Sequence, residues 1–229
     1  MPERQVLIFD ADDTLWENNV YFEQAFEEFA GFLAHSTLAP AEVRSVLDGI
    51  ETVNREIHSY GARNFGRNLR ECYQRLAERE ISAGDLDRVM SFAERILEQP
   101  LELIEGVSET IASLAGRHEL ILFTKGHTEE QAYKIEVSGL APHFRHTAIV
   151  KEKDAASFRA LVEERGLPPE RTWMVGNSPR SDINPALDIG LGAVYLPHAR
   201  TWSLETEEIR DGSGRLLVLE KFADLLRHF

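Results

Sequence analysis

The sequence predicts an α/β protein in which a Rossmann-like parallel sheet carries helices on both faces, together with an inserted α-helical bundle domain. After Pro100, short apolar runs of strand length alternate with segments of helical periodicity, the pattern of a parallel sheet joined by helices. Between about residues 21 and 99 the apolar spacing is helical throughout, and Pro40, Gly61 and Gly84 divide it. The length of 229 residues suits one or two domains.

The first strand is expected at residues 5–10, a continuous apolar run ended by an acid, which is typical of a strand buried on both faces. Four helical stretches follow with no strand between them, and this arrangement predicts a separate bundle. Further strands are expected at 119–123, 147–150, 172–175, 193–196 and 216–219, and helices at 108–115, 129–138, 154–165 and 183–188, before a short terminal helix. We therefore expect a core domain of residues 1–16 and 101–229 and a helical domain of residues 17–100.

The composition excludes several classes of function. With 25 basic and 39 acidic residues the net charge is −14, so we expect neither bulk nucleic-acid binding nor attraction to an anionic membrane. No signal peptide and no apolar run long enough to cross a bilayer is expected. The single cysteine, Cys72, excludes an internal disulfide framework, falls on an apolar helical stripe and indicates a reducing compartment, the cytoplasm. Either a monomer or a homodimer is compatible with the sequence.

Polar and charged residues follow the apolar runs at four of the predicted strand ends. Because sites in open α/β sheets lie at the carboxyl ends of the strands, we expect these side chains to converge on one edge. The candidates are Asp10, Asp12 and Thr14 after the first strand, Thr124 and Lys125 at the second, Lys151 and Lys153 after the third, and Asn177 and Asp182 after the fourth.

This set of carboxylates, hydroxyl, ammonium and amide matches phosphoryl transfer through an aspartyl-phosphate. A carboxylate that attacks phosphorus needs charge compensation, because negative oxygens surround the phosphorus. Mg²⁺ held by hard oxygen ligands and a lysine both supply positive charge, and a hydroxyl can donate to a phosphoryl oxygen. A second carboxylate can protonate the leaving oxygen and later activate water.

The sequence resembles the haloacid dehalogenase superfamily in four motifs. They are the Asp-x-Asp-x-Thr segment at 10–14, Thr124 after a strand, Lys153, and the acidic cluster at 176–182. The resemblance covers the core, about two-thirds of the chain, and the helical insertion stands where that family often carries a cap domain.

The resemblance implies a role for each matching position. Asp10 would be the nucleophile and Asp12 the general acid/base, and Thr124 and Lys153 would hold the phosphoryl group, with Lys151 as the rival lysine. Asp10, the main-chain carbonyl of Asp12 and Asn177 would bind Mg²⁺, with Asp182 as a further or indirect ligand. Two positions depart from the family pattern: Asn177 stands where Asp is more usual, and Asp13 stands where glycine is usual.

Lys125, together with Arg63 and Arg67 of the helical insertion, is a further candidate for binding the anionic substrate. The insertion has Arg63, Arg67 and Arg70 on one predicted helical face. A solvated surface, with Glu71 as an ion-pair partner, is one interpretation. The other is a face that closes over the site and contacts an anionic substrate.

The expected function is a Mg²⁺-dependent phosphatase acting on a small phosphorylated metabolite. A halide-releasing hydrolase would attack carbon and would need neither Mg²⁺ nor the second aspartate. A phosphomutase would share the covalent step but protect the intermediate from water. A non-catalytic protein that kept the fold is a third alternative.

Overall fold

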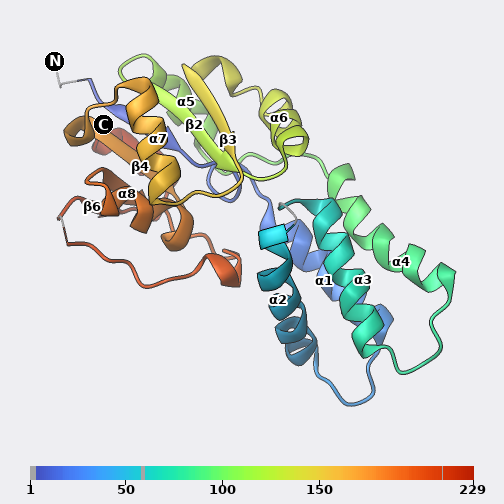
Figure 1. Cartoon of the computed structure of the whole chain (residues 1–229). Coiled ribbons are helices and arrows are strands. Elements are labelled where there is room, and N and C mark those ends of the chain that lie inside the picture. The colour runs from blue at the N-terminus through green and yellow to red at the C-terminus, as the bar shows by residue number, and fades with distance from the viewer. Residues whose placement is uncertain (1–3, 58–59, 213) are drawn as a thin grey trace. The chain divides into compact units, whose positions relative to one another are not determined.

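The computed structural model describes residues 4–57, 60–212 and 214–229, and the chain divides into two compact units (Figure 1). One unit comprises Met1–Glu17 and Leu101–Phe229, and the other comprises Asn18–Pro100. The described residues of the second unit form helices joined by loops and contain no strand. Its role as a cap stays a prediction.

The first unit is built on a six-stranded parallel sheet, and this confirms the predicted α/β class. The strands are β1 (Val6–Phe9), β2 (Glu119–Lys125), β3 (His146–Val150), β4 (Thr172–Gly176), β5 (Gly192–Tyr195) and β6 (Leu216–Val218). Their order is β3-β2-β1-β4-β5-β6, and every pairing is parallel. The first strand therefore lies inside the sheet, between β2 and β4.

Alternating residues of β1 belong to different cores, because successive side chains of a strand point to opposite faces. Leu7 and Phe9 pack in one apolar cluster with α5 (Val107–Ala115). Ile8 packs in a second cluster with Phe158 of α7 (Ala155–Arg165). Both faces of the sheet are thus covered, which explains why the strand sequence is continuously apolar.

The remaining elements of this unit connect the strands. They are α6 (Thr128–Val137), α8 (Asn184–Asp188), the short 3₁₀ segments η2 (Ala141–His143), η3 (Pro169–Arg171), η5 (Ser203–Glu205) and η6 (Phe222–Arg227), and the π-helical turn η4 (Pro179–Ile183). The predicted terminal helix is the 3₁₀ segment η6, in which the Asp224 N–H donates to the Lys221 carbonyl three residues before it.

The second unit is a bundle of α1 (Asn19–Leu33), α2 (Pro40–Ile57), α3 (Ala62–Leu76) and α4 (Ala83–Glu94), followed by η1 (Arg95–Glu98). Helix α4 begins with a reciprocal capping box between Ser82 and Asp85. The inner faces share one core, to which Phe29, Leu47 and Leu69 contribute fully buried side chains. This core is separate from the three apolar clusters of the unit that contains the sheet, so each unit buries its own apolar surface.

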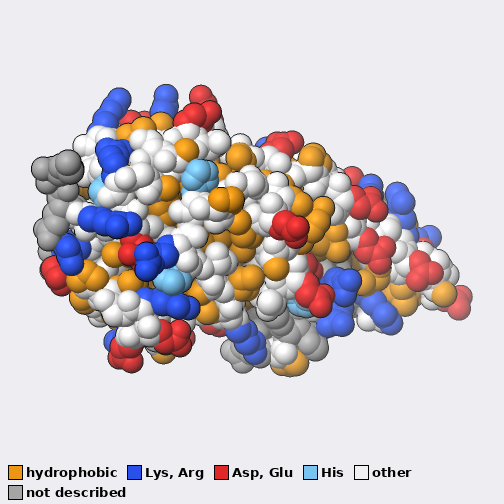
Figure 2. Space-filling view, turned by 90° about the horizontal axis from the view of Figure 1, so that it is seen from above, with side chains coloured by type: hydrophobic (Ala, Val, Ile, Leu, Met, Phe, Trp, Pro, Cys, Tyr) orange, Lys and Arg blue, Asp and Glu red, His pale blue; other side chains and the backbone are white. Residues whose placement is uncertain are grey.

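No helix within the described residues is both long and apolar enough to span a bilayer. On the face shown in Figure 2, acidic, basic and apolar side chains are interspersed. Lys and Arg side chains on that face are therefore mixed with Asp and Glu side chains.

Cys72 is fully buried in the core of the helical unit, and burial raises the pKa of its thiol to about 12. Since the thiolate is the reactive form, we expect no modification of the native protein by a thiol reagent at pH 8. After unfolding in urea the thiol should react stoichiometrically. Rapid labelling of the native protein at pH 8, followed by absorbance, would contradict the buried placement.

Candidate active site

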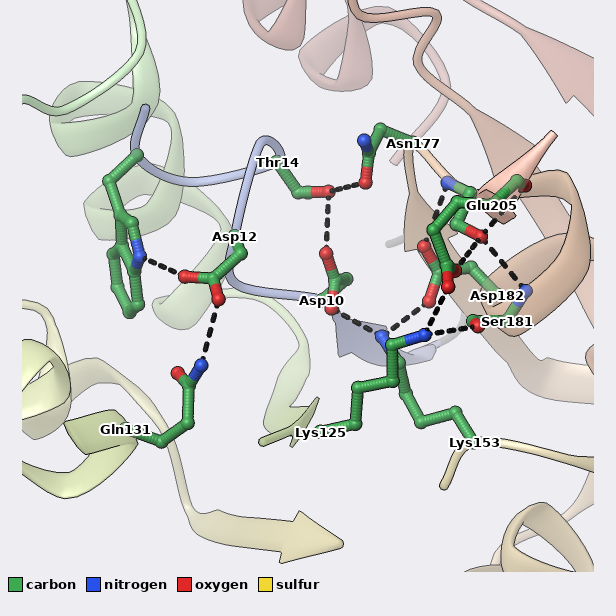
Figure 3. A network of polar contacts seen from close by, with 12 residues as sticks. Asp10, Asp12, Thr14, Lys125, Gln131, Lys153, Asn177, Ser181, Asp182 and Glu205 are labelled. Atoms are coloured by element: carbon green, nitrogen blue, oxygen red, sulfur yellow. Dashed lines mark hydrogen bonds and ion pairs between the residues drawn. The ribbon is translucent and has the colours of Figure 1, made fainter. Parts of the chain in front are cut away.

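The polar residues expected at the strand ends lie together at the carboxyl edge of the sheet (Figure 3). Asp10 directly follows β1, and its N–H donates to the Val175 carbonyl of β4. Thr124 and Lys125 end β2, and Asn177 follows β4. Because β2 and β4 flank β1, the ends of three neighbouring strands bring these residues to one place.

The Asp10 carboxylate is almost fully buried and has a different partner at each oxygen. Oδ2 accepts a hydrogen bond of 3.0 Å from the Thr14 hydroxyl, four residues along the same loop. Oδ1 forms an ion pair with the Lys153 ammonium. The carboxylate is therefore held in one orientation at the edge of the sheet.

Lys153 lies between two carboxylates, those of Asp10 and Asp182. Only 4% of Lys153 is exposed, whereas Lys151 is exposed. The structure thus brings Lys153, of the two rival lysines, to Asp10. Burial alone would lower the pKa of Lys153, but the two carboxylates outweigh it and raise that pKa, so the ammonium stays charged.

Asp182 is fully buried, and both of its oxygens are engaged. Oδ1 pairs with Lys153, and Oδ2 accepts a 3.0 Å hydrogen bond from the Ser178 N–H. Burial and the charge of Asp10 raise the pKa of the Asp182 carboxyl to about 7, although Lys153 and the Ser178 N–H act in the opposite direction. A Cβ on Gly176 would lie 2.3 Å from Asp182 Oδ2, so only glycine leaves room for this carboxylate.

The Asn177 amide directs its oxygen to the Thr14 hydroxyl, which also contacts Asp10 (Figure 3). Nδ2 donates to the Thr201 hydroxyl at 3.3 Å, and Oδ1 accepts from the Thr14 hydroxyl at 3.2 Å. The same hydroxyl contacts Asp10 Oδ2, so the carboxylate oxygen of Asp10 and the amide oxygen of Asn177 both lie next to the Thr14 hydroxyl. Such oxygens are the ligands Mg²⁺ prefers, and Asp10 and Asn177 therefore fit as ligands for this ion.

The Asp12 carboxylate points away from Asp10 and toward helix α6 (Figure 3). Oδ1 accepts from the Trp16 indole N–H at 2.7 Å and from the Lys134 ammonium at 2.5 Å. Oδ2 accepts from the Gln131 amide at 2.8 Å. Burial raises the pKa of Asp12, but Lys134 and the two hydrogen bonds more than offset it, and the net pKa is lowered.

Lys125 is paired with Glu205 of the loop that follows β5, and it donates to the Ser181 hydroxyl at 2.7 Å. Glu205 also accepts from the Ser178 hydroxyl at 2.6 Å. Although burial acts to raise it, Lys125 and these hydroxyls lower the pKa of Glu205 to about 2. Lys125, which we expected to contact the substrate, thus forms an ion pair with a buried carboxylate of the protein.

The remaining candidates lie as follows. Thr124 is buried at the end of β2, in register with Ile149 of β3. Arg63 and Arg67 are exposed on α3 of the helical unit, and Arg67 donates to the Asn64 side chain at 3.0 Å. Substrate contact by these arginines stays a prediction.

Asp13, which stands where the related family usually has glycine, adopts a φ of +60°. Aspartate tolerates this left-handed conformation better than most residues, so the turn survives the replacement. Asp13 also forms a cluster with Glu17 and His198. The imidazole lies 3.3 Å from Glu17 through Nε2 and accepts from the Arg200 N–H through Nδ1, so the chain itself engages both ring nitrogens.

Sequence reasoning missed several residues of this network: Gln131, Lys134, Ser181, Thr201 and Glu205. Gln131 and Lys134 are three residues apart on the helix after β2, a spacing that places both on one face. Glu205 lies in an irregular segment with no periodicity. Neither feature distinguishes a residue of the site from a surface residue in a single sequence.

A sequence model of the haloacid dehalogenase-like hydrolases matches residues 5–190, and the chain belongs to this family. It is 25% identical over 185 residues to a phosphoserine phosphatase from Thermus thermophilus, which covers 77% of this chain and 70% of that protein. A haloacid dehalogenase-like hydrolase structure from Xanthomonas campestris is 30% identical, with a TM-score of 0.84 over 98% of this chain and 95% of that one. An L-2-haloacid dehalogenase from Xanthobacter autotrophicus has the same fold, with 14% identity and a TM-score of 0.64 over 98% of each chain.

Glu205→Gln should destabilise the protein by roughly 3 kcal/mol at pH 7, because it removes the buried carboxylate that pairs with the half-buried Lys125 ammonium. The pKa of Glu205 is lowered from 4.5 to about 2, so its contribution is present above pH 4.5 and is lost as the pH falls toward 2. Urea denaturation at pH 7 and at pH 3 measures both effects.

Glu207→Gln is the matched control, since Glu207 is an exposed residue of the same segment and pairs with Arg210 on the surface. Its loss should change the unfolding free energy by less than about 1 kcal/mol. Equal stabilities of the two variants at pH 7 would contradict a structural role for the Lys125–Glu205 pair.

Proposed function

We propose that this hydrolase is a Mg²⁺-dependent phosphatase that cleaves a small phosphomonoester through a phospho-aspartate on Asp10. The observation that carries the proposal is the buried Asp10 carboxylate, held by the Thr14 hydroxyl and the Lys153 ammonium at the carboxyl edge of the sheet. The similarity to a phosphoserine phosphatase supports phosphomonoesters as the substrate class.

In the first half of the reaction Asp10 attacks phosphorus in line, and the ester oxygen leaves on the opposite side. Lys153 compensates charge on the phosphoryl oxygens, and the Thr124 hydroxyl donates to one of them. Asp12 gives its proton to the leaving oxygen, so the alcohol departs uncharged. Substrate binding brings negative charge against ionised Asp12 and favours its protonation.

In the second half a water molecule takes the place of the alcohol. Asp12, now ionised, accepts a proton from this water, whose oxygen attacks phosphorus. The P–O bond to Asp10 breaks, inorganic phosphate leaves, and the Asp10 carboxylate is regenerated. The lowered pKa of Asp12 suits this half of the reaction, because it favours the ionised base.

Charge balance supports a bound cation. The network contains four carboxylates, of Asp10, Asp12, Asp182 and Glu205, each paired with one of the ammonium groups of Lys125, Lys134 and Lys153. A phosphomonoester adds further negative charge. When bound, Mg²⁺ would neutralise charge on the phosphoryl group, with Asp10, the Asp12 main-chain carbonyl and Asn177 as its ligands. We assign Asp182 to holding Lys153, since both of its oxygens are engaged.

Two other reactions of the same fold are the alternatives. A halide-releasing hydrolase would have no use for an acid at Asp12 or a metal at Asn177. A phosphomutase would return the phosphoryl group to its substrate. Release of halide from a 2-haloacid, or phosphate transfer without phosphate release, would favour these alternatives. The substrate is proposed to be a small phosphorylated metabolite, and the monomeric or homodimeric state and the cytoplasmic location stay predictions.

A phosphate-release screen over phosphomonoesters, with Mg²⁺ or with EDTA, tests the proposal. We expect turnover of at least one alkyl phosphate with Mg²⁺ and loss of that turnover in EDTA. Rapid acid quenching of labelled substrate should trap a protein-bound phosphate that hydroxylamine releases, as expected of an acyl phosphate.

Asp10→Asn should lower kcat by at least about 10⁴-fold, since the amide cannot serve as the nucleophile. It should also abolish the trapped phosphate. Asp13→Asn is the matched control in the same turn and should keep both, because Asn also tolerates a φ of +60°. Wild-type activity of Asp10→Asn would refute the covalent mechanism.

We also propose that Arg63 and Arg67 contact the substrate anion. Replacing both by alanine should raise KM on the best substrate about tenfold with kcat within a factor of two, since about 1.4 kcal/mol of binding is lost. Arg88→Ala, on an exposed position of α4, is the control. An unchanged KM in the double variant would show that these arginines are solvated surface residues that do not contact the substrate.

A further inference from the structure

Two residues of helix α6, neither of them in the four motifs, donate hydrogen bonds to the Asp12 carboxylate. Gln131 and Lys134, one turn apart, both direct their polar ends to Asp12. The indole N–H of Trp16 supplies the third donor. Three donors on one carboxylate restrict it far more than a side chain in water would be restricted.

Gln131 is the most specialised of these donors. Only 4% of its surface is exposed, and it is an uncharged side chain whose burial costs free energy unless it is hydrogen-bonded. The carboxylate can only accept, so the amide NH₂ group must face Asp12. Its Oε1 is buried without a partner, so the rest of its surroundings do not determine this orientation.

The backbone before α6 is shaped around Gln131. Gly126 has a φ of +145°, and a Cβ at this position would lie 3.0 Å from Gln131 Nε2 and 3.1 Å from its Cγ. A side chain at Gly126 would therefore require the Gln131 side chain to shift by a few tenths of an ångström. The residue that directly follows β2 thus leaves the space that Gln131 occupies.

The location of the carboxylate fits an acid that acts on the leaving group. In an in-line displacement the leaving oxygen lies on the far side of phosphorus from the nucleophile. An acid that pointed at Asp10 would occupy the space of the phosphoryl group. The Asp12 carboxylate instead points away from Asp10, toward Gln131 (Figure 3).

We propose that Gln131, in the space left by Gly126, is a positioning residue that holds the Asp12 carboxylate where it meets the leaving oxygen. This inference rests on the proposed phosphatase activity. It predicts a defect that depends on the leaving group, because an alkoxide needs a proton from Asp12 to depart, whereas p-nitrophenolate is stable enough to leave without one.

Gln131→Met, which keeps the side-chain length and removes the amide, is the test. The substrates are p-nitrophenyl phosphate and the alkyl phosphate that the wild type cleaves fastest in the release screen. We compare kcat/KM, which reports the steps up to formation of the phosphoenzyme. On the alkyl ester it should fall about 100-fold, and on p-nitrophenyl phosphate less than threefold.

Asp12→Ala should show the same pattern with a larger loss on the alkyl ester. Gln74→Met, at an exposed glutamine of α3, should change neither value. Should Gln131→Met fail to fold, Gln131→Leu also removes the amide donor to Asp12 without adding a charge, so the same selective loss is expected.

Three results would overturn the inference: no loss on either ester, an equal loss on both, or a gain on the alkyl ester, which would mean that Gln131 restrains Asp12. If Asp12→Ala is selective and Gln131→Met is not, the phosphatase mechanism stands and the role of Gln131 falls. A wild-type protein that cleaves neither ester overturns both proposals.

Discussion

The burial of the Lys153 ammonium between the carboxylates of Asp10 and Asp182 is the interaction on which the rest of the site depends. A buried cation is tolerated only when anions surround it, so the two aspartates and the lysine must be placed together. Asp182 reaches this position because Gly176 has no Cβ and because the Ser178 N–H holds its second oxygen. One ion triad thus joins the end of β1, the segment before α7 and the turn after β4.

The same rule explains how an acidic chain can accept an anion. Each lysine of the network is matched with a carboxylate: Lys153 as above, Lys134 with Asp12, and Lys125 with Glu205. The acid excess of the composition therefore continues into the site, where it is locally balanced by cations instead of being exposed to the substrate. A metal ion held by neutral and anionic oxygens would complete this balance, and the Asn177 amide, oriented by Thr201, is suited to it.

The fold class could be predicted from the spacing of apolar residues along the chain, because that spacing reflects which residues are buried. The run from Val6 to Phe9 is apolar on both faces, and β1 lies between two strands with a core on each side. The helical spacing of residues 21–99 matches α1 to α4. The candidate residues at the strand ends were also recognisable, since Asp10 and Asn177 directly follow strands and Lys153 comes three residues after one, and parallel strands end at a common edge.

The sequence by itself determined the fold class and the residue types that meet at the sheet edge, because periodicity and strand ends are local properties. Only the tertiary structure decided which groups touch. It placed Lys153 between two acids and left Lys151 exposed, although both are lysines of one short loop. It also paired Lys125 with Glu205, 80 positions later, and Asp12 with Gln131, 119 positions later. Contacts over such separations depend on how helices and loops pack on the sheet, which no spacing within a single sequence encodes.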